Sequence, residues 1–194
     1  METDIKTTSG VPETPSFFSP KFIDPEAVIN QLQLPVGAVV ADFGCGSGYF
    51  SLPVAKKIGK DGTVFSLDIL PQSLESVASR AKLLGITNII TNRVNLEKLG
   101  GSKLPDDSMD LVILKDMLFQ NKDKSLILSE AKRVMKKTGQ ILIVEWDPAD
   151  SSIGPERSLR ISKEALLEVA QGNGLGISQE LQAGDFHYGL ILSK

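Results

Sequence analysis

Cysteine and histidine are almost absent from this chain of 194 residues, which contains one of each, Cys45 and His187. A single cysteine excludes an intrachain disulfide, and there is no cysteine cluster that would hold zinc or an iron–sulfur cluster. The composition therefore predicts a protein without a metal centre and suits the reducing cytoplasm.

Long apolar runs and an excess of one charge are also missing. No segment approaches the ~18 consecutive apolar residues that span a bilayer, and the N-terminus lacks the basic start and apolar block of a secretory signal. The formal net charge is −3 and 23% of the residues are charged, which favours neither a polyanion-binding surface nor a disordered acidic chain. We therefore expect a soluble protein whose partner is not recognised by bulk charge.

The N-terminal residues 1–16 are rich in Thr, Ser, Pro and Glu and show no apolar period, which predicts a mobile arm. Three phenylalanines follow, ahead of a helix from Asp24 to about Leu32 with Asp24 as its N-cap. They favour packing of this helix against the core, and a lid over a binding cleft is the alternative. These residues are Phe17, Phe18 and Phe22.

Strands and helices alternate along the rest of the chain. Short buried apolar runs predict strands, and apolar residues three and four positions apart predict the helices between them, with glycine and proline marking the ends. The expected strands are 39–43, 63–68, 88–92, 109–114, 140–145, 177–181 and 186–192. After the first helix, a second is expected to end near residue 58, and three more are expected over residues 71–84, 124–137 and 162–171.

The last two expected strands are joined by a tight turn at Ala183-Gly184, so they must run antiparallel. The earlier β-to-α units imply a parallel sheet with helices on both faces, because right-handed crossovers bring each helix back across the sheet. We predict a doubly wound α/β fold with a mostly parallel seven-stranded sheet and a C-terminal antiparallel hairpin, formed by residues 17–194 as a single domain.

A glycine-rich loop between the first strand and its helix is the most informative segment. Gly44, Gly46 and Gly48 alternate shortly after Asp42, and glycine permits positive φ and close approach of a ligand to the backbone. Asp68 ends the second strand, 20 residues beyond Gly48, where a carboxylate can accept hydrogen bonds from both ribose hydroxyls. Helix capping is the alternative role for Asp68, but the loop upstream favours a nucleotide-like ligand.

The spacing G-x-G-x-G after Asp42 differs from the G-x-G-x-x-G of dinucleotide enzymes. It resembles the first motif of class I S-adenosylmethionine-dependent methyltransferases, and residues 64–68 look like their second. Residues 109–116 resemble the fourth motif, whose end faces the sulfonium and the substrate, and residues 133–140 are similar to the segment that follows it. The resemblance extends from about residue 18 to residue 194, and the chain is similar to small-molecule and quinone-type enzymes of this family.

The resemblance implies S-adenosylmethionine as the cofactor and assigns residues to it. The three glycines would pass beneath its methionine part, Asp42 would orient the loop and the cofactor's amino group, and Asp68 would hold the ribose. Ile69 would pack on the adenine and the Leu96 backbone N–H would reach its ring, while Asn95 replaces the acidic residue that usually contacts the adenine amino group. The implied cofactor-binding set is Asp42, Gly44, Gly46, Gly48, Asp68, Ile69, Asn95, Leu96 and Lys115.

Two carboxylates near strand ends are candidates for acid–base chemistry. Methyl transfer is an in-line displacement that mainly requires alignment, but a hydroxyl or protonated amine acceptor must also lose a proton. Asp116 and Glu145 are the best-placed bases, and a helix cap and a surface ion pair are their respective alternatives. His187 is interpreted as a packed, hydrogen-bonded strand residue, and Arg160 as a surface salt-bridge partner rather than a contact for an acidic substrate.

The sequence does not identify the methyl acceptor, but it narrows the classes. Cys45 is expected to pack as a small apolar residue, and there is no second cysteine for the cytosine-C5 or arsenic methylation of related enzymes. The N/D-P-P-Y/F run of enzymes that methylate planar amino groups is absent as well. A small-molecule acceptor is expected, because the short basic groups on the helices favour solvated faces over nucleic-acid binding. The alternatives are an RNA or protein methyltransferase, a non-catalytic cofactor-binding module and a nicotinamide-dependent oxidoreductase.

Overall fold

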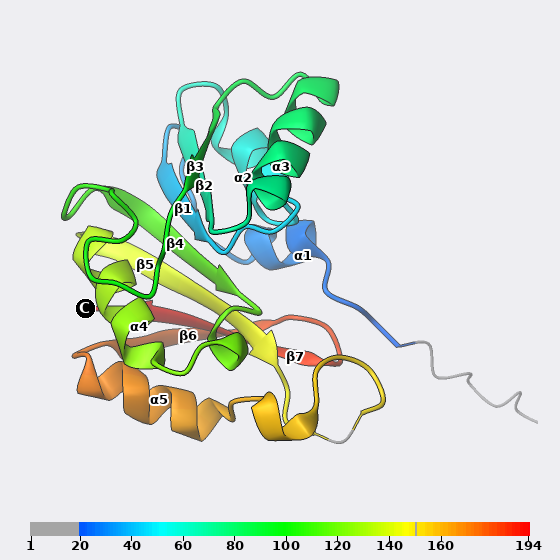
Figure 1. Ribbon diagram of the computed structural model, residues 1–194, viewed down its shortest axis with the longest axis vertical. Coiled ribbons are helices and arrows are strands. Elements are labelled where there is room, and N and C mark those ends of the chain that lie inside the picture. The colour runs from blue at the N-terminus through cyan, green and yellow to red at the C-terminus, as the bar shows by residue number, and fades with distance from the viewer. Residues whose placement is uncertain (1–19, 150) are drawn as a thin grey trace, which may run out of the picture.

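A computed structural model describes residues 20–149 and 151–194 of the chain. Within these ranges the strands form one seven-stranded sheet in the order β3-β2-β1-β4-β5-β7-β6 (Figure 1). The strands are β1 (Val39–Phe43), β2 (Thr63–Asp68), β3 (Ile89–Arg93), β4 (Met109–Lys115), β5 (Met135–Trp146), β6 (Gly176–Gln182) and β7 (His187–Ser193). The helices are α1 (Pro25–Asn30), α2 (Ser51–Ile58), α3 (Pro71–Leu83), α4 (Lys124–Val134) and α5 (Lys163–Gly172), with single 3₁₀ turns η1 (Leu118–Gln120) and η2 (Arg157–Leu159).

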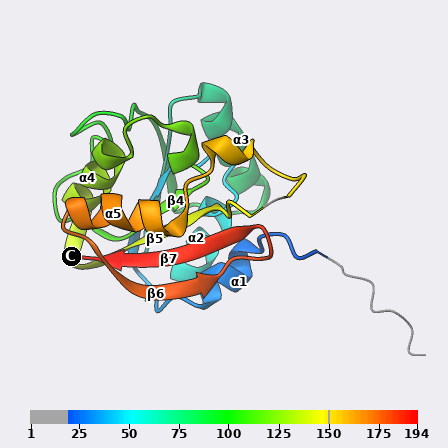
Figure 2. The same cartoon turned by 90° about the horizontal axis from the view of Figure 1, so that it is seen from below.

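The direction of the strands confirms the predicted fold. Strands β1 to β5 pair in parallel, whereas β7 runs antiparallel to β5 and β6 antiparallel to β7. Figure 2 shows this β6–β7 hairpin along one edge of the sheet. The sequence therefore predicted the doubly wound, mostly parallel sheet and its C-terminal hairpin correctly. The predicted arm of residues 1–16, together with Phe17 and Phe18, lies outside the described residues.

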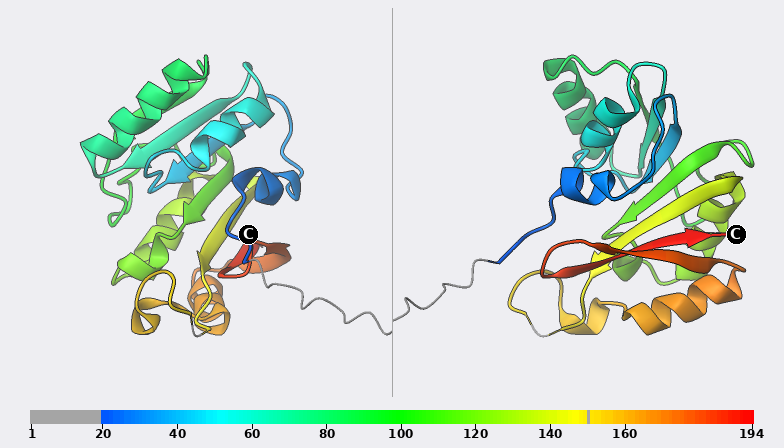
Figure 3. Two further views of the ribbon diagram at one scale, coloured as in Figure 1. Left: turned by 90° about the vertical axis from the view of Figure 1, so that its right-hand side faces the viewer. Right: turned by 180° about the vertical axis from the view of Figure 1, so that it is seen from behind.

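The sheet is covered on both faces because successive strand residues point to opposite sides. In β1, Val40 belongs to a cluster with residues of α1 and α2, whereas Ala41 and Phe43 belong to a cluster with residues of α4 and α5. The two views in Figure 3 show these helix groups around the sheet. Burial on both sides explains why central strands such as β1 and β4 are largely apolar, whereas the edge strand β6 is mostly exposed and mostly polar.

The start of β5 is the main difference from the predicted elements. The expected helix over 124–137 ends at Val134, and the strand begins at Met135 instead of residue 140. Met135 is fully buried and pairs with Met109, after which the register between β4 and β5 shifts before Leu111. Lys136 and Lys137 follow Lys132 and Arg133 by four positions, as in an amphipathic helix, but burial of Met135 in the sheet decides the local structure.

The N-terminal segment packs on the turn of the hairpin. The backbone N–H of Lys21 donates to Asp185 Oδ2 (2.8 Å), and the Asp185 N–H donates back to the Lys21 carbonyl (2.9 Å). The ring of Phe22 lies 5.4 Å from that of Phe186, although 61% of Phe22 remains exposed. The expected packing of α1 on the core holds for its buried residues Val28 and Ile29. None of the helices in the described ranges is long and apolar enough to cross a membrane.

Replacement of Gly48 should test the packing between α2 and α3. Its φ is +84°, and an added Cβ would lie 3.1 Å from Val77 Cγ2 of α3. We expect Gly48→Ala to lower the free energy of unfolding by about 1–3 kcal/mol, because left-handed strain and overpacking add. Gly172→Ala is the control, since no atom lies within 4 Å of its Cβ position, and it should change stability by at most about 1 kcal/mol. Chemical denaturation monitored by circular dichroism measures both, and equal effects would contradict this interpretation.

Candidate functional site

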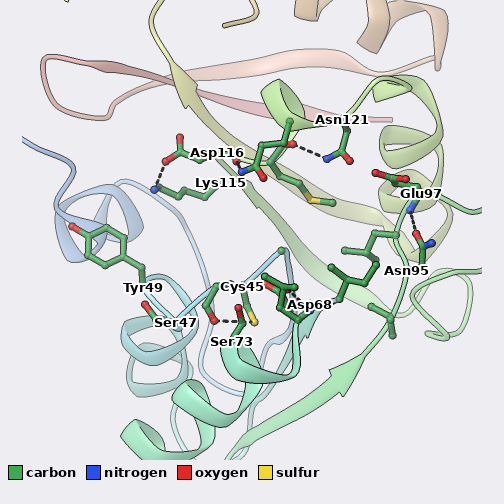
Figure 4. A pocket seen from close by; sticks show the side chains of 18 residues that line it. Cys45, Ser47, Tyr49, Asp68, Ser73, Asn95, Glu97, Lys115, Asp116 and Asn121 are labelled. Atoms are coloured by element: carbon green, nitrogen blue, oxygen red, sulfur yellow. Dashed lines mark hydrogen bonds and ion pairs between the residues drawn. The ribbon is translucent and has the colours of Figure 1, made fainter. Parts of the chain in front are cut away.

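A cavity of about 630 Å³ lies at the carboxyl ends of the parallel strands. Its volume is in the range of small-molecule sites, roughly 300–1,000 Å³. It opens where β1 has β2 on one side and β4 on the other, the point at which open α/β sheets bind their ligands. The predicted site residues that line it are Gly44, Gly46, Asp68, Ile69, Asn95, Leu96, Lys115 and Asp116 (Figure 4). Asp42, Gly48 and Glu145 do not line it.

The glycine loop forms one wall of the cavity. Gly44, Gly46 and Gly48 all have positive φ, at +68°, +50° and +84°. The backbone N–H groups of Gly44 and Cys45 both donate to the Leu67 carbonyl, at 2.8 and 3.0 Å, which ties the loop to the end of β2. A Cβ on Gly46 would meet no atom within 4 Å. Gly46 therefore borders open space in which a ligand can approach the backbone closely.

Asp68 links the glycine loop to the start of α3. Its Oδ2 accepts a hydrogen bond from the Gly46 N–H (3.0 Å), and its Oδ1 accepts one from the Leu70 N–H (2.9 Å). The side chain lines the cavity and the residue is 9% exposed. A carboxylate offers about four lone-pair sites, so these two bonds leave acceptor capacity for a ligand. The local helix-start role and a ligand-binding role are therefore compatible.

Asp42 lies beneath the loop instead of beside the cavity. It is 2% exposed and accepts a hydrogen bond from Ser51 Oγ (2.5 Å), which itself accepts one from Ser66 Oγ (2.7 Å). Burial away from water raises the pKa of Asp42 to about 6. This chain joins β1, α2 and β2, which agrees with the expected orienting role of Asp42. Asp42 does not line the cavity, and its implied contact with the amino group of a ligand stays a prediction.

The opposite end of the cavity combines apolar surface with an acid. Ile69 is 54% exposed although it is apolar, and Leu96 lies in the same lining. Asn95 Oδ1 accepts a hydrogen bond from the Glu97 N–H (2.9 Å) and so shapes a turn. Glu97 is exposed at the cavity. The chain therefore presents a carboxylate two positions after Asn95, where the sequence resemblance had suggested only an amide.

Lys115, Asp116 and Tyr49 form a polar end of the cavity. Lys115 Nζ pairs with Asp116 Oδ2 and lies 5.6 Å from the centroid of the Tyr49 ring. The Tyr49 hydroxyl donates to the Ile23 carbonyl (2.5 Å). Asp116 has a φ of +51°, a left-handed conformation that is uncommon for residues other than glycine and is often found at functional sites. This strained turn directs the chain from β4 into the loop that precedes η1.

Glu145 stabilises the loop that leads from β4 into η1. It is fully buried, and its Oε1 accepts a hydrogen bond from the Leu118 N–H (2.6 Å) at the start of η1. Burial is the main cause that raises its pKa to about 7, and the negative charge of Asp116 raises it further. Because Glu145 does not line the cavity, its position fits an anchor for η1 better than a base in contact with substrate.

His187 and Arg160 differ from their predicted environments. His187 is packed, as expected, with its ring 4.0 Å from that of Trp146, but neither ring nitrogen makes a hydrogen bond within the described part of the chain. Arg160 is only 9% exposed and binds no carboxylate among the described residues. Its guanidinium instead donates to carbonyl oxygens of its own loop, those of Asp147, Ala149, Ile153 and Pro155. The predicted surface salt bridge of Arg160 is therefore wrong.

Comparison with known proteins identifies the family of this fold and loop. The family model described as a methyltransferase domain matches residues 35–179. The chain belongs to the methyltransferase-domain family. This result confirms the resemblance to S-adenosylmethionine-dependent methyltransferases that the sequence motifs suggested.

Individual relatives of this methyltransferase domain are distant. An arsenite methyltransferase of Aquipseudomonas alcaligenes is 29% identical over 110 residues, which cover 54% of this chain and 32% of the relative. A ubiquinone/menaquinone biosynthesis C-methyltransferase of a Marinomonas species is 28% identical over 126 residues, covering 64% of this chain and 49% of the relative. The chain thus spans between a third and a half of the length of these curated relatives.

A solved structure supports the fold over most of the methyltransferase domain. The S-adenosylmethionine-dependent methyltransferase of Aquifex aeolicus aligns with a TM-score of 0.81 at 22% identity, and the alignment covers 88% of this chain and 89% of that one. At this identity the likeness establishes the shared fold.

Sequence reasoning missed several residues that line the cavity. Tyr49 directly follows the glycine loop, and Glu97 follows Asn95 by two positions, so proximity to the motifs was the available signal. The others lie in the turn after β4, in the glycine loop or at the start of α3, where no periodicity marks a binding role. The missed lining residues include Ser47, Tyr49, Ser73, Glu97, Met117, Gln120 and Asn121.

The raised pKa of Glu145 predicts a pH dependence of stability. Because the folded state holds this proton more tightly than the unfolded chain, whose Glu pKa is near 4.5, the contribution of Glu145 is fully present below pH 4.5 and is lost as the pH rises through 7. Glu145→Gln cannot ionise. Its free energy of unfolding should therefore fall less between pH 5 and pH 8 than that of the wild type, by on the order of 2–3 kcal/mol.

Denaturation curves at the two pH values measure this difference. Glu180→Gln is the matched control, since the Glu180 side chain is 60% exposed and should follow the wild type. An unchanged pH dependence in Glu145→Gln would exclude Glu145 as its source.

Proposed function

We propose that this domain transfers a methyl group from S-adenosylmethionine to a small-molecule acceptor. The observation that carries the proposal is the cavity at the ends of β1, β2 and β4, in which open backbone at Gly46 lies next to the carboxylate of Asp68. Family membership adds the expected chemistry of this site.

The cavity offers open space, apolar surface and hydrogen-bond acceptors that suit the cofactor. The open space at Gly46 accommodates a ligand against the loop backbone, and Asp68 has acceptor capacity for ribose hydroxyls. Exposed Ile69 and the adjoining Leu96 provide apolar surface for a planar base, and Glu97 offers an acceptor for an exocyclic amino group. When bound, S-adenosylmethionine supplies an electrophilic methyl group on a sulfonium.

The polar end of the cavity is the proposed acceptor side. Lys115, which the sequence resemblance included in the cofactor-binding set, lies with Asp116 and Tyr49 on one side of the cavity, and Asp68 and Asn95 lie on the other (Figure 4). Met117, the residue after Asp116, also lines the cavity. These groups bind and orient the acceptor, which is the main requirement for an in-line displacement. Asp116 is the residue of this end that can accept a proton.

The relatives favour a small-molecule acceptor without naming it. One relative is named an arsenite methyltransferase and another a C-methyltransferase of ubiquinone/menaquinone biosynthesis. Cys45 is a poor candidate for thiol chemistry. Burial, together with the charges of Asp42 and Asp68, raises the pKa of the Cys45 thiol, so it stays protonated. RNA or protein methylation and a non-catalytic cofactor-binding role are the alternative proposals, and the cytoplasmic location stays a prediction.

Calorimetric titration with S-adenosylhomocysteine, the demethylated product, tests the cofactor site. We expect saturable binding to the intact chain and a loss of at least about tenfold in affinity for Asp68→Asn, because an amide accepts fewer hydrogen bonds than a carboxylate and bears no charge. Asp68→Asn retains an oxygen for the Gly46 or Leu70 N–H, so circular dichroism should show a folded protein.

Asp61→Ala provides the control, because Asp61 lies in an exposed turn between α2 and β2 and should bind like the wild type. If the folded wild type fails to bind S-adenosylhomocysteine but binds NADH, the oxidoreductase alternative replaces this proposal.

A further inference from the structure

Several buried polar atoms behind the cavity have no hydrogen-bond partner within the described residues. They belong to the end of β4, to β5 and to the start of β7, which are adjacent in the sheet. Buried polar atoms are normally paired, because an unpaired one costs roughly 1–3 kcal/mol. A group of them at one place therefore calls for a functional explanation. The atoms are Asp116 Oδ1, Glu145 Oε2, His187 Nδ1 and His187 Nε2.

Asp116 and His187 form the centre of this group. His187 Nε2 lies 3.2 Å from Asp116 Oδ1, which is an ion-pair distance if the ring is protonated, although the two atoms do not have the geometry of a hydrogen bond. The Asp116 side chain lines the cavity and is 14% exposed, whereas the His187 side chain is 5% exposed and does not line it. The carboxylate thus stands between the imidazole and the cavity. A proton that reaches Asp116 from a ligand has a second acceptor directly behind it.

The position of His187 is fixed by packing on the side away from Asp116. Its ring lies against Trp146, and the Arg160 guanidinium lies 5.7 Å from the Trp146 ring centroid. A Cβ on Gly154 would lie 2.5 Å from the Trp146 ring, so this glycine allows the loop to pack directly on it. The buried Arg160 with its carbonyl partners therefore holds a wall that keeps the imidazole next to Asp116.

The charge of Lys115 favours some classes of methyl acceptor over others next to Asp116. Its ammonium pairs with Asp116 Oδ2 and borders the cavity. A fixed positive charge disfavours a cationic amine as acceptor, and it stabilises negative charge on oxygen. A carboxylate that accepts a proton and an ammonium beside it suit an acceptor whose hydroxyl loses its proton as it reacts.

We propose that Asp116 and His187 act as one proton-accepting pair and that the methyl acceptor is a hydroxyl-bearing small molecule. The acceptor oxygen forms the new bond to the methyl carbon while the carbon–sulfur bond breaks and its electron pair stays on sulfur. The hydroxyl proton moves to the Asp116 carboxylate and is shared with His187 Nε2. Asp116 is the catalytic residue of the pair because it lines the cavity, and His187 acts through Asp116 by sharing the proton. This inference rests on the proposed function for its reaction, but the pair itself is testable without any ligand.

Besides Arg160, whose guanidinium lies over the Trp146 ring, few other charged groups lie near the pair. Lys115 adjoins Asp116 at the end of β4, and Glu145 contributes a buried carboxyl from β5. The Tyr188 hydroxyl, next to His187 on β7, is engaged with the Ile161 carbonyl at 3.0 Å. Asp185, two positions before His187, is exposed. Asp116 is thus the group whose charge should affect His187 most strongly.

Nuclear magnetic resonance of the imidazole tests the pair, because His187 is the only histidine. The chemical shifts of its ring atoms Nε2 and Cε1 are recorded at one pH in the ligand-free wild type, Asp116→Asn and Asp185→Asn. We expect the Nε2 shift to change most in Asp116→Asn, because Nε2 lies 3.2 Å from the Asp116 carboxylate. Asp185→Asn is the matched loss of one charge and should change the Nε2 shift by less than half as much. Equal changes in the two variants would overturn the pair.

A matched set of acceptors tests the substrate class. Naphthalen-2-ol, its thiol and its amine share one skeleton, and formation of S-adenosylhomocysteine reports transfer to each. We expect the hydroxyl compound to be preferred, its kcat to fall at least about 100-fold in Asp116→Asn and about tenfold in His187→Gln, with little change in KM. His187→Gln keeps a hydrogen-bond donor but cannot bind a proton, so wild-type kcat in this variant would overturn the proton-accepting role of His187. Preference for the thiol or amine, or no transfer to the hydroxyl compound, would overturn the acceptor class.

Calorimetry separates these outcomes from failure of the cofactor site. Asp116→Asn and His187→Gln should bind S-adenosylhomocysteine within about threefold of the wild type, because neither residue is assigned to the nucleoside end. Loss of binding in the wild type itself would contradict the proposed function and leave the imidazole chemical shifts as an independent result on the pair.

Discussion

The hydrogen bonds of Asp68 determine the shape of the proposed cofactor site. One carboxylate fixes the Gly46 N–H on one side and the Leu70 N–H on the other, so the glycine loop and the entry to α3 keep a defined separation. The Leu67 carbonyl adds two hydrogen bonds from the loop. Because β1 and β2 are paired in parallel up to Phe43 and Leu67, both contacts come from strand ends that the sheet already aligns. The cavity is thus a consequence of strand register and of one side chain.

Two further carboxylates stabilise loops, although their own burial is unfavourable. Asp42 and Glu145 are almost inaccessible to water, and burial raises the pKa of each. Desolvation of a carboxylate is unfavourable unless hydrogen bonds offset it. Asp42 receives the Ser51 hydroxyl and Glu145 the Leu118 N–H. The unfavourable desolvation of these carboxylates is consistent with a protein in which the positions of the glycine loop and η1 matter more than maximal stability.

The parts of the structure that depend on local pattern were predictable from sequence. Apolar runs located the strands, and the alternating glycines followed by Asp68 located the cavity, because these features depend on backbone conformation and on which strand ends are adjacent. Helix α4 was extended too far, since the lysines after Val134 fit an amphipathic helix equally well and only the pairing of Met135 with Met109 decides otherwise.

Contacts between distant segments could not be predicted in the same way. The interpretation of Arg160 as a surface residue failed because its partners are main-chain carbonyls, which carry no sequence signal. Glu97 was missed because its place in the cavity depends on the turn formed by Asn95. The depth of Glu145 likewise depends on a loop that folds over it. In each case the residue type was visible, but the geometry that defines its role was not.

The direction of β7 in the C-terminal hairpin places His187 near the site. The parallel strands bring their carboxyl ends to the cavity edge, whereas β7 is antiparallel to β5 and therefore brings its first residue there. That residue is His187, which pairs in register with Trp146 and reaches the Asp116 carboxylate at the end of β4. A parallel strand in the place of β7 would present its last residue, Ser193, at this edge. The antiparallel closure of the sheet thus places the only imidazole of the chain behind the proposed acceptor side of the cavity.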